Sequence, residues 1–235
     1  MPISEPVNRW EAARAEWDRD MRVEAGRARL AVIALGATAV LHGVEIVAAA
    51  GGQTESMAPA LSIGEPVSLL VTAVLFLRWL HRAVAFTAIM NPTRLKWTPA
   101  AAVWGFFMPI VGLWRPYQVV RDVHDALAPD AVPEPAPRPR LDGAGGYRHV
   151  EMERAPAPAA LPHASIGWWW GLFVGARVLG LGDAQRSTWI GAAVSILSAI
   201  LGGLVVRAID GRLAERFRRV RHASDEELSA WEVRA

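Results

Sequence analysis

The chain has 235 residues, 52% of them hydrophobic, and a net charge of only +2. The hydrophobic residues gather into long blocks separated by arginine-rich or proline-rich stretches, which is not the spread that a soluble core needs. The sequence contains no cysteine, which excludes disulfides, thiolate metal sites and cysteine nucleophiles. Together these features predict an all-α fold, a polytopic bundle of membrane helices.

The first 29 residues do not have the pattern of a signal peptide. They carry six arginines and six acidic residues, whereas a signal peptide has a short basic lead into an apolar run. We therefore expect residues 1–29 to form a cytoplasmic amphipathic helix, and the first apolar block to be retained as a span.

Five apolar blocks follow along the chain: Leu30–Ala50, Ile63–Leu77, Thr98–Trp114, Ile166–Gly182 and Thr188–Val206. A helix of about 20 apolar residues spans a hydrocarbon core of about 30 Å. The first and last blocks have this length, and the second and fourth reach it with their flanking residues. The third block would span only about 25 Å and contains Pro109, which interrupts a helix.

The arginines indicate the orientation, because positively charged residues concentrate in cytoplasmic loops. The loop Gly51–Ser62 has no arginine or lysine, and Asp183–Ser187 has only Arg186. Several lie in each of the other connecting and terminal stretches. Both termini are therefore expected in the cytoplasm. The chain has 24 arginines and one lysine, a ratio that is typical of a GC-rich bacterial gene. The expected location is a bacterial inner membrane.

Cytoplasmic termini require an even number of crossings. We predict four transmembrane helices, with Thr98–Trp114 as a re-entrant or interfacial segment; five spans with the amino terminus outside are the alternative. The stretch Pro116–Leu127, with proline in its first turn, predicts an interfacial helix. The expected organisation is a helix at 1–29, two spans with the re-entrant segment and interfacial helix at 30–127, a disordered Pro/Ala/Gly-rich cytoplasmic loop at 128–165, two spans at 166–207 and a cytoplasmic helical tail at 208–235.

Small residues line the last two spans at helical spacing. Gly191, Ser195, Ser198 and Gly202 form a stripe in the last span, and Gly171 lies four residues before a second glycine in the preceding one. Such stripes let another helix approach closely. They indicate packing within the bundle or, alternatively, a subunit interface.

Charged groups inside the spans are costly unless paired or hydrated, so they mark structural or functional sites. Glu45 lies five residues before Ala50, and Arg177 five residues before Gly182, so both sit at one depth if both helices run outward. We predict a buried pair of Glu45 and Arg177, with His42 one turn away. This group either fixes helix register or lines a cavity or ion path. The other spans do not repeat the His-x-x-Glu spacing, so no metal site is expected.

A second polar group lies at the cytoplasmic end of the second span, where spacings of three and four put Arg78, His81 and Arg82 on one face. We expect contact with anionic lipid headgroups or, alternatively, an anionic ligand pocket, with help from Arg94, Lys96 and Arg115. Tryptophans expected as interfacial anchors are Trp79, Trp97, Trp114, Trp168, Trp169 and Trp170.

The motifs of the middle of the chain resemble a known family. The stretches FLRWLHRAV (Phe76–Val84) and WTPAAAVWGFFMPIVGLWRPYQVVRDV (Trp97–Val123), followed by a linker and Trp168–Trp170, are similar to the bacterial membrane proteins grouped as domain of unknown function 4328. Pro109 and the turn Arg115-Pro116-Tyr117 are the more specific features. Phe86 stands near where many members have asparagine. The resemblance implies a membrane protein and supplies no activity.

No catalytic residues, cofactor or nucleic-acid surface is expected. The serines lack a partnered histidine and carboxylate, and the arginines are explained by sidedness. The sequence favours a non-enzymatic integral membrane protein that acts as an assembly subunit, scaffold or sensor. Its expected partners are anionic membrane lipids and other membrane subunits or itself. The alternative is a homo-oligomeric ion channel or small transporter lined by Glu45, His42 and Arg177.

Overall fold

The structure, a computed structural model, describes residues 9–52, 54–90, 95–108, 110–128, 140–141, 147–148, 163–179 and 187–222. Arg94, Pro109 and most of the predicted loop 128–165 lie outside the described residues. The helices are α1 (Arg9–Ala50), α2 (Thr54–Met90), α3 (Pro99–Trp104), the 3₁₀ turn η1 (Val111–Leu113), α4 (Arg115–Ala126), α5 (His163–Leu179) and α6 (Ser187–His222). Two-residue strands, β1 (Arg140–Leu141) and β2 (Tyr147–Arg148), pair antiparallel. The predicted all-helical fold is confirmed apart from this short pair.

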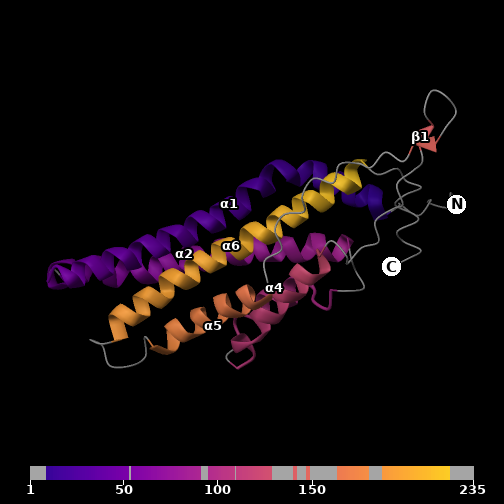
Figure 1. Cartoon of the computed structure of the whole chain (residues 1–235). Helices are drawn as coiled ribbons and strands as arrows, with labels where there is room; N and C mark the ends of the chain where they lie inside the picture. Colours follow the sequence, from indigo (N-terminus) through magenta and orange to yellow (C-terminus); the bar gives the residue numbers. More distant parts are fainter. Residues whose placement is uncertain are drawn as a thin grey trace, which may run out of the picture.

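The long helices form an antiparallel bundle (Figure 1). α6 packs along both α1 and α5, and α1 also pairs with α2. The start of α1 and the end of α6 lie at the same end of the bundle, which also holds α4 (Figure 1). With 42 residues, α1 is about 63 Å long, roughly twice the thickness of a hydrocarbon core. The charged amino-terminal segment and the first apolar block are therefore one continuous helix.

The boundaries of the elements differ from the predicted ones in two places. α2 already begins at Thr54, so the connection after α1 is much shorter than the expected loop 51–62. Gly52 makes this tight turn possible with a left-handed φ of 66°, which glycine adopts without a steric penalty. α5 begins at His163, so the predicted loop 128–165 extends three residues into a helix.

Three helices in the described part of the chain are long and apolar enough to cross a bilayer, over Gly26–Ala50, Pro59–Ala88 and Trp189–Phe217. Their outward faces carry exposed large apolar side chains, such as Val40 and Val47 on α1. A continuous apolar surface of this kind is what contact with lipid requires. The membrane character predicted from composition is thereby supported. α5 has 17 residues and is about 25 Å long.

The buried core lies toward the end of the bundle that holds α4. It joins the early part of α1, the late parts of α2 and α6, the start of α5 and the apolar face of α4. On α4 the predicted face is fully buried, with Val120 and Val123 at 0% exposure and Leu127 at 2%. This helix therefore packs its apolar face on the protein. Its predicted proline start is confirmed, because Pro116 occupies the first turn.

Three of the expected interfacial anchors belong to this core instead. Trp79, Trp169 and Trp170 are 3%, 5% and 8% exposed, whereas Trp168 is 67% exposed. Successive residues of a helix point about 100° apart, so only one of three adjacent tryptophans can face outward where α5 meets its neighbours. Trp114 is exposed and Trp97 half-buried. These three rings therefore pack inside the protein, which differs from the position at the membrane interface that the sequence predicted.

The block 98–114 is not one helix. Thr98 caps α3 by accepting a hydrogen bond from the Ala101 amide at 3.2 Å, and α3 ends after only six residues at Gly105. The chain then turns back closely, because a Cβ at Gly105 would lie 2.8 Å from Cδ of Arg115. Most of the large side chains of the turn are exposed: Trp104, Phe107, Met108, Ile110 and Leu113. This segment is a turn that projects exposed apolar side chains away from the bundle.

Candidate functional site

A small polar cluster joins α1 to α2 within the apolar zone. The hydroxyl of Thr38 lies 2.9 Å from those of both Ser68 and Thr72, and Thr72 also donates to the carbonyl of Ala34 at 3.2 Å. Hydroxyl bonds of this kind hold membrane helices together where no water can replace them. The cluster fixes the register of α2 against α1.

One turn beyond Thr38, the predicted polar residues His42 and Glu45 contact each other. Nδ1 of His42 lies 2.8 Å from Oε2 of Glu45, and the side chains are only 5% and 14% exposed. The spacing of three residues along α1 brings them onto one face. The carboxylate predicted to pair with Arg177 is thus held by a residue of its own helix.

Among the described residues, no ion pair joins Arg177 to Glu45. The guanidinium of Arg177 stacks over the ring of Phe173 at 5.4 Å, and its buried Nε finds no hydrogen-bond partner in the described part of the chain. The acidic group whose charge acts on it is Glu65 of α2. The direct pair is therefore not formed, because Glu45 turns to His42. Glu65 was not singled out, although its charge within the second apolar block is the same kind of evidence that drew attention to Glu45.

The contacts of Gly202 give the depth of Glu45 and Arg177 along the bundle. Gly202 of α6 faces both Trp169 of α5 and Leu35 of α1. Along antiparallel helices at 1.5 Å per residue, Arg177 then lies about 12 Å and Glu45 about 15 Å beyond this level. Both are displaced toward the same end of the bundle. The four polar groups His42, Glu45, Glu65 and Arg177 occupy one zone near the end opposite α4.

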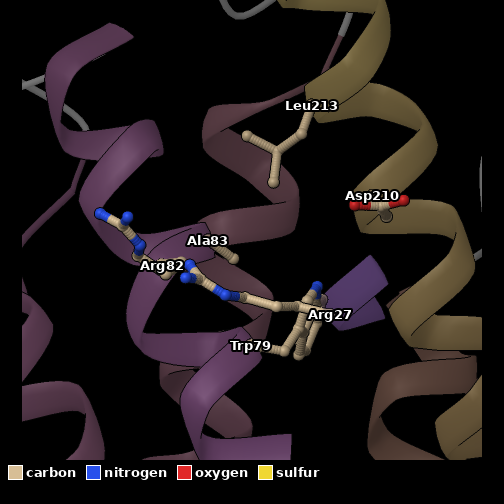
Figure 2. Close-up of a pocket in the computed structure, with 6 residues that line it drawn as sticks. All are labelled: Arg27, Trp79, Arg82, Ala83, Asp210 and Leu213. Carbon is tan, nitrogen blue, oxygen red and sulfur yellow. The ribbon is translucent and has the colours of Figure 1, made fainter. Parts of the chain in front are cut away.

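A hollow near the other end contains further charges (Figure 2). Its lining comes from α1, α2 and α6: Arg27, Trp79, Arg82, Ala83, Asp210 and Leu213. The indole N–H of Trp79 is buried there and has no hydrogen-bond partner among the described residues. Two arginines and one aspartate, contributed by three different helices, therefore line the same hollow. Arg27 and Asp210 were not predicted, since they lie far from Arg82 in the chain.

The six cations expected to act together are spread over separate places. Arg78 and His81 are exposed on the outside of α2, whereas Arg82 lines the hollow and stacks on Phe86 at 5.8 Å. Lys96 is exposed. Arg115 stacks over Trp97, 4.7 Å from the ring centroid. The structure therefore offers an exposed cationic face on α2 but no single pocket formed by the described members of this set.

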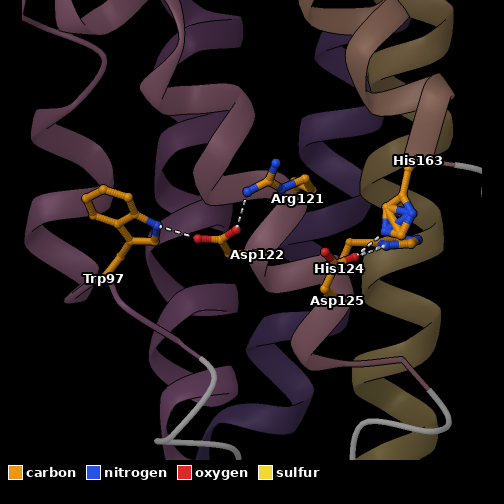
Figure 3. A network of polar contacts seen from close by, with 6 residues as sticks. All are labelled: Trp97, Arg121, Asp122, His124, Asp125 and His163. Carbon is orange, nitrogen blue, oxygen red and sulfur yellow. Dashed lines mark hydrogen bonds and ion pairs between the residues drawn. The ribbon is translucent and has the colours of Figure 1, made fainter.

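A network ties the segment before α3 to α4 (Figure 3). Nε1 of Trp97 donates to Oδ2 of Asp122 at 3.0 Å, and Arg121 donates to Oδ1 of the same carboxylate at 3.2 Å. The hydrogen bond from Arg121 to Asp122 raises the pKa of Arg121 above its ordinary value. Arg121 also stacks over Tyr117 of the predicted turn, at 5.6 Å. Trp97 thus joins the segment before α3 to α4.

A second group in Figure 3 brings together residues that the sequence separates widely. His124 and Asp125 end α4, and His163 begins α5. Both imidazoles contact Oδ1 of Asp125, with His124 Nδ1 at 3.2 Å and His163 Nε2 still closer. One potential ligand atom from each of the three residues lies within 4.8 Å of the others. Their chemistry is that of a site for a transition metal ion, a kind of site that was not expected.

The two histidines differ in environment. His124 is buried, and within the described residues its Nε2 has no hydrogen-bond partner, whereas the side chain of His163 is 61% exposed. Burial lowers the pKa of His124, so its imidazole stays neutral at neutral pH. Nη1 of the buried Arg212 on α6 donates to the backbone carbonyl of His124 at 2.9 Å and fixes the end of α4. No periodic pattern connects positions 124 and 163, so the sequence could not reveal the group.

Comparison with known families agrees with the motifs. The sequence model of the family described as Domain of unknown function (DUF4328) matches residues 45–211. The chain belongs to this family. The match runs from Glu45 in α1 to the late part of α6, so it includes Glu65, Arg177, α3, α4 and the His124 group, whereas His42 and Arg27 lie before it. No curated protein and no solved structure matches the chain. The predicted family resemblance is confirmed.

Proposed function

We propose that this member of the DUF4328 family is a non-enzymatic assembly subunit of a bacterial inner membrane, crossing the bilayer four times with both ends in the cytoplasm. The observation that carries the proposal is the division of the bundle into two parts. One part has exposed apolar side chains suited to lipid, and the other has a buried core with charged helical extensions. The second part is a folded cytoplasmic platform for partners.

Parity supports the fourth crossing. α2 ends at the end of the bundle that holds α4, and α6 starts at the opposite end (Figure 1). The chain between them must therefore cross an odd number of times. α5 runs antiparallel to α6, because its first residue lies near Arg212 through the His124 group while Trp169 lies against Gly202. α5 is the crossing that the parity requires.

The two ends of the block 98–114 support a re-entrant segment. Trp97 precedes the block and Arg115 follows it, yet the guanidinium lies 4.7 Å from the indole ring. Entry and exit are thus side by side, next to the carboxylate of Asp122. Between them the exposed apolar side chains of the turn provide a surface that lipid can cover. The segment dips into the membrane and returns to the cytoplasmic side.

Single-cysteine labelling tests this topology in a chain that has no cysteine of its own. Ser56→Cys should react only with an impermeant maleimide added outside, whereas Pro135→Cys and Asp225→Cys should react only from the cytoplasmic side. Phe107→Cys, in the dip, should not react from outside. Opposite sidedness of positions 135 and 225 would rule out the four-span arrangement.

The assembly role is tested by subunit content. Native mass spectrometry of the protein extracted from its own membrane should give a defined complex with further copies or other subunits. Gly171 is exposed on α5, and no other segment among the described residues lies within 4 Å of an added Cβ, so this position can contact another helix. Gly171→Leu is expected to reduce self-association if copies meet there. A single chain with no partner would contradict the assembly proposal.

The zone of His42, Glu45, Glu65 and Arg177 favours an ion channel or small transporter as the second candidate. These groups lie at similar depth, with the hydroxyl cluster around Thr38 deeper in the bundle. In liposomes, a path through this zone predicts ion flux that Glu45→Gln reduces and that Ser62→Ala, at the exposed outer end of α2, leaves unchanged. Absence of flux with the unaltered protein would exclude this candidate.

A further inference from the structure

The cluster at the junction of α4 and α5 has the composition of a metal site. Two imidazoles and one carboxylate, from His124, Asp125 and His163, present ligand atoms within 4.8 Å of one another. Histidine nitrogen and carboxylate oxygen bind zinc and related ions at about 2.0–2.2 Å, which puts neighbouring ligand atoms of a tetrahedral ion roughly 3.3 Å apart. Nδ1 of His124 lies 3.2 Å from Oδ1 of Asp125, which matches this separation, and Nε2 of His163 contacts the same oxygen.

The surroundings also fit an ion. The position of His124 is fixed, because α4 packs on the core and Arg212 binds the end of α4. His124 presents Nδ1 to the cluster, 3.2 Å from Oδ1 of Asp125, and its side chain is only 6% exposed. Asp125 and His163 are 41% and 61% exposed, so water can reach the cluster and supply the remaining coordination position. One side of the site is rigid and the other is open to entry.

We propose that His124, Asp125 and His163 bind one divalent transition metal ion, of which Zn²⁺ is the best match, and that the ion clips the start of α5 to the end of α4. Neutral imidazoles with one carboxylate suit zinc and cobalt better than calcium or magnesium, which prefer oxygen alone. The bound ion joins the two ends of the long connection between α4 and α5. It thereby fixes α5, the shortest of the four spans, to the cytoplasmic platform.

A metal ion at this place holds α5, a helix of 17 residues, in its position beside α6. Residues 38 positions apart in the chain contact each other here. An ion that binds only the folded arrangement stabilises it by RT ln(1 + c/Kd), where c is the ion concentration, so the stabilisation rises with the logarithm of the ion concentration. Loading the site should therefore protect the contact between α4 and α5 against unfolding.

The test uses the full chain in detergent, purified through an affinity tag without histidine and stripped with a chelator. Titration with Zn²⁺, followed by metal analysis after gel filtration, should show one tightly bound ion per chain. Co²⁺ should give the visible absorption of a tetrahedral site with nitrogen and oxygen ligands. Thermal unfolding should shift to higher temperature with metal.

Two ligand variants and one matched control decide the outcome. His163→Asn and Asp125→Asn change exposed side chains, so both should fold, and each should weaken binding about tenfold or more. His222→Asn, at the end of α6, removes a histidine elsewhere and should bind like the unaltered protein. Equal binding by all four proteins, or no binding by the unaltered protein, would show that the cluster is a hydrogen-bonded contact without a metal. Either result would overturn the proposal and leave the topology experiments unaffected.

Discussion

The contact between Gly202 and Trp169 allows a sharp test of how α5 docks on α6. A methyl group at position 202 would lie 2.7 Å from Nε1 and 3.1 Å from Cδ1 of Trp169. The ring has little room to move, because Trp169 is 5% exposed and packs against Phe76 and Trp170 at centroid distances of 5.5 and 5.6 Å. Gly202→Ala must therefore push the two helices apart.

The expected cost follows from overpacking, which typically destabilises a core by about 1–3 kcal/mol. Alanine also stabilises a helix by up to about 1 kcal/mol relative to glycine, which would hide part of that cost. Gly211→Ala is the matched control, since Gly211 lies on the same helix and an added Cβ there meets no other segment of the described chain within 4 Å. Against this control, Gly202→Ala should lower the free energy of unfolding by about 1–3 kcal/mol.

The assay is unfolding by SDS in mixed micelles, followed by tryptophan fluorescence. A double variant with Trp169→Phe should recover part of the loss caused by Gly202→Ala, because the smaller ring vacates the space that the methyl group needs. Equal stability of Gly202→Ala and Gly211→Ala would refute the close approach of α5 and α6.

Three further variants probe other contacts. Thr38→Val removes the hydroxyl between α1 and α2 and should destabilise the bundle by about 0.6–1.7 kcal/mol in the same SDS assay; no change would mean that the cluster does not hold the helices. Trp97→Phe keeps the ring under Arg115 but loses the hydrogen bond to Asp122, so about 1 kcal/mol of stability should be lost and Phe107→Cys should become more reactive toward maleimide. Arg212→Gln leaves the end of α4 without its charged donor, and a loss of about 1.5–3 kcal/mol is expected in thermal unfolding.

Local features of the sequence predicted the elements themselves. The lengths of the apolar blocks identified the long helices, because crossing a bilayer fixes a minimum number of apolar residues. The proline turn and the spacing of Val120, Val123 and Leu127 predicted α4 and its buried face, since a helix repeats every 3.6 residues. The short, proline-containing block 98–114 was correctly distinguished from an ordinary continuous helix.

Partners across the chain were decided only by the tertiary structure. The sequence paired Glu45 with Arg177 by depth, but depth alone does not say which faces of two helices meet. The structure joins Glu45 to His42 and sets the charge of Glu65 against Arg177. For the same reason, the run of tryptophans in α5 could not reveal that Trp169 is buried against Gly202.

The sequence by itself determined that this is a helical protein of the DUF4328 family with helices long and apolar enough to cross a membrane, because hydrophobic length and the family motifs are properties of continuous stretches. Only the tertiary structure decided where charges and ligands converge. The contact of His163 with Asp125 depends on how α5 packs against α4 and α6, and no stretch of sequence contains that information. Rotation of each helix about its own axis is set by side-chain packing across the bundle, and that rotation selects which polar groups meet.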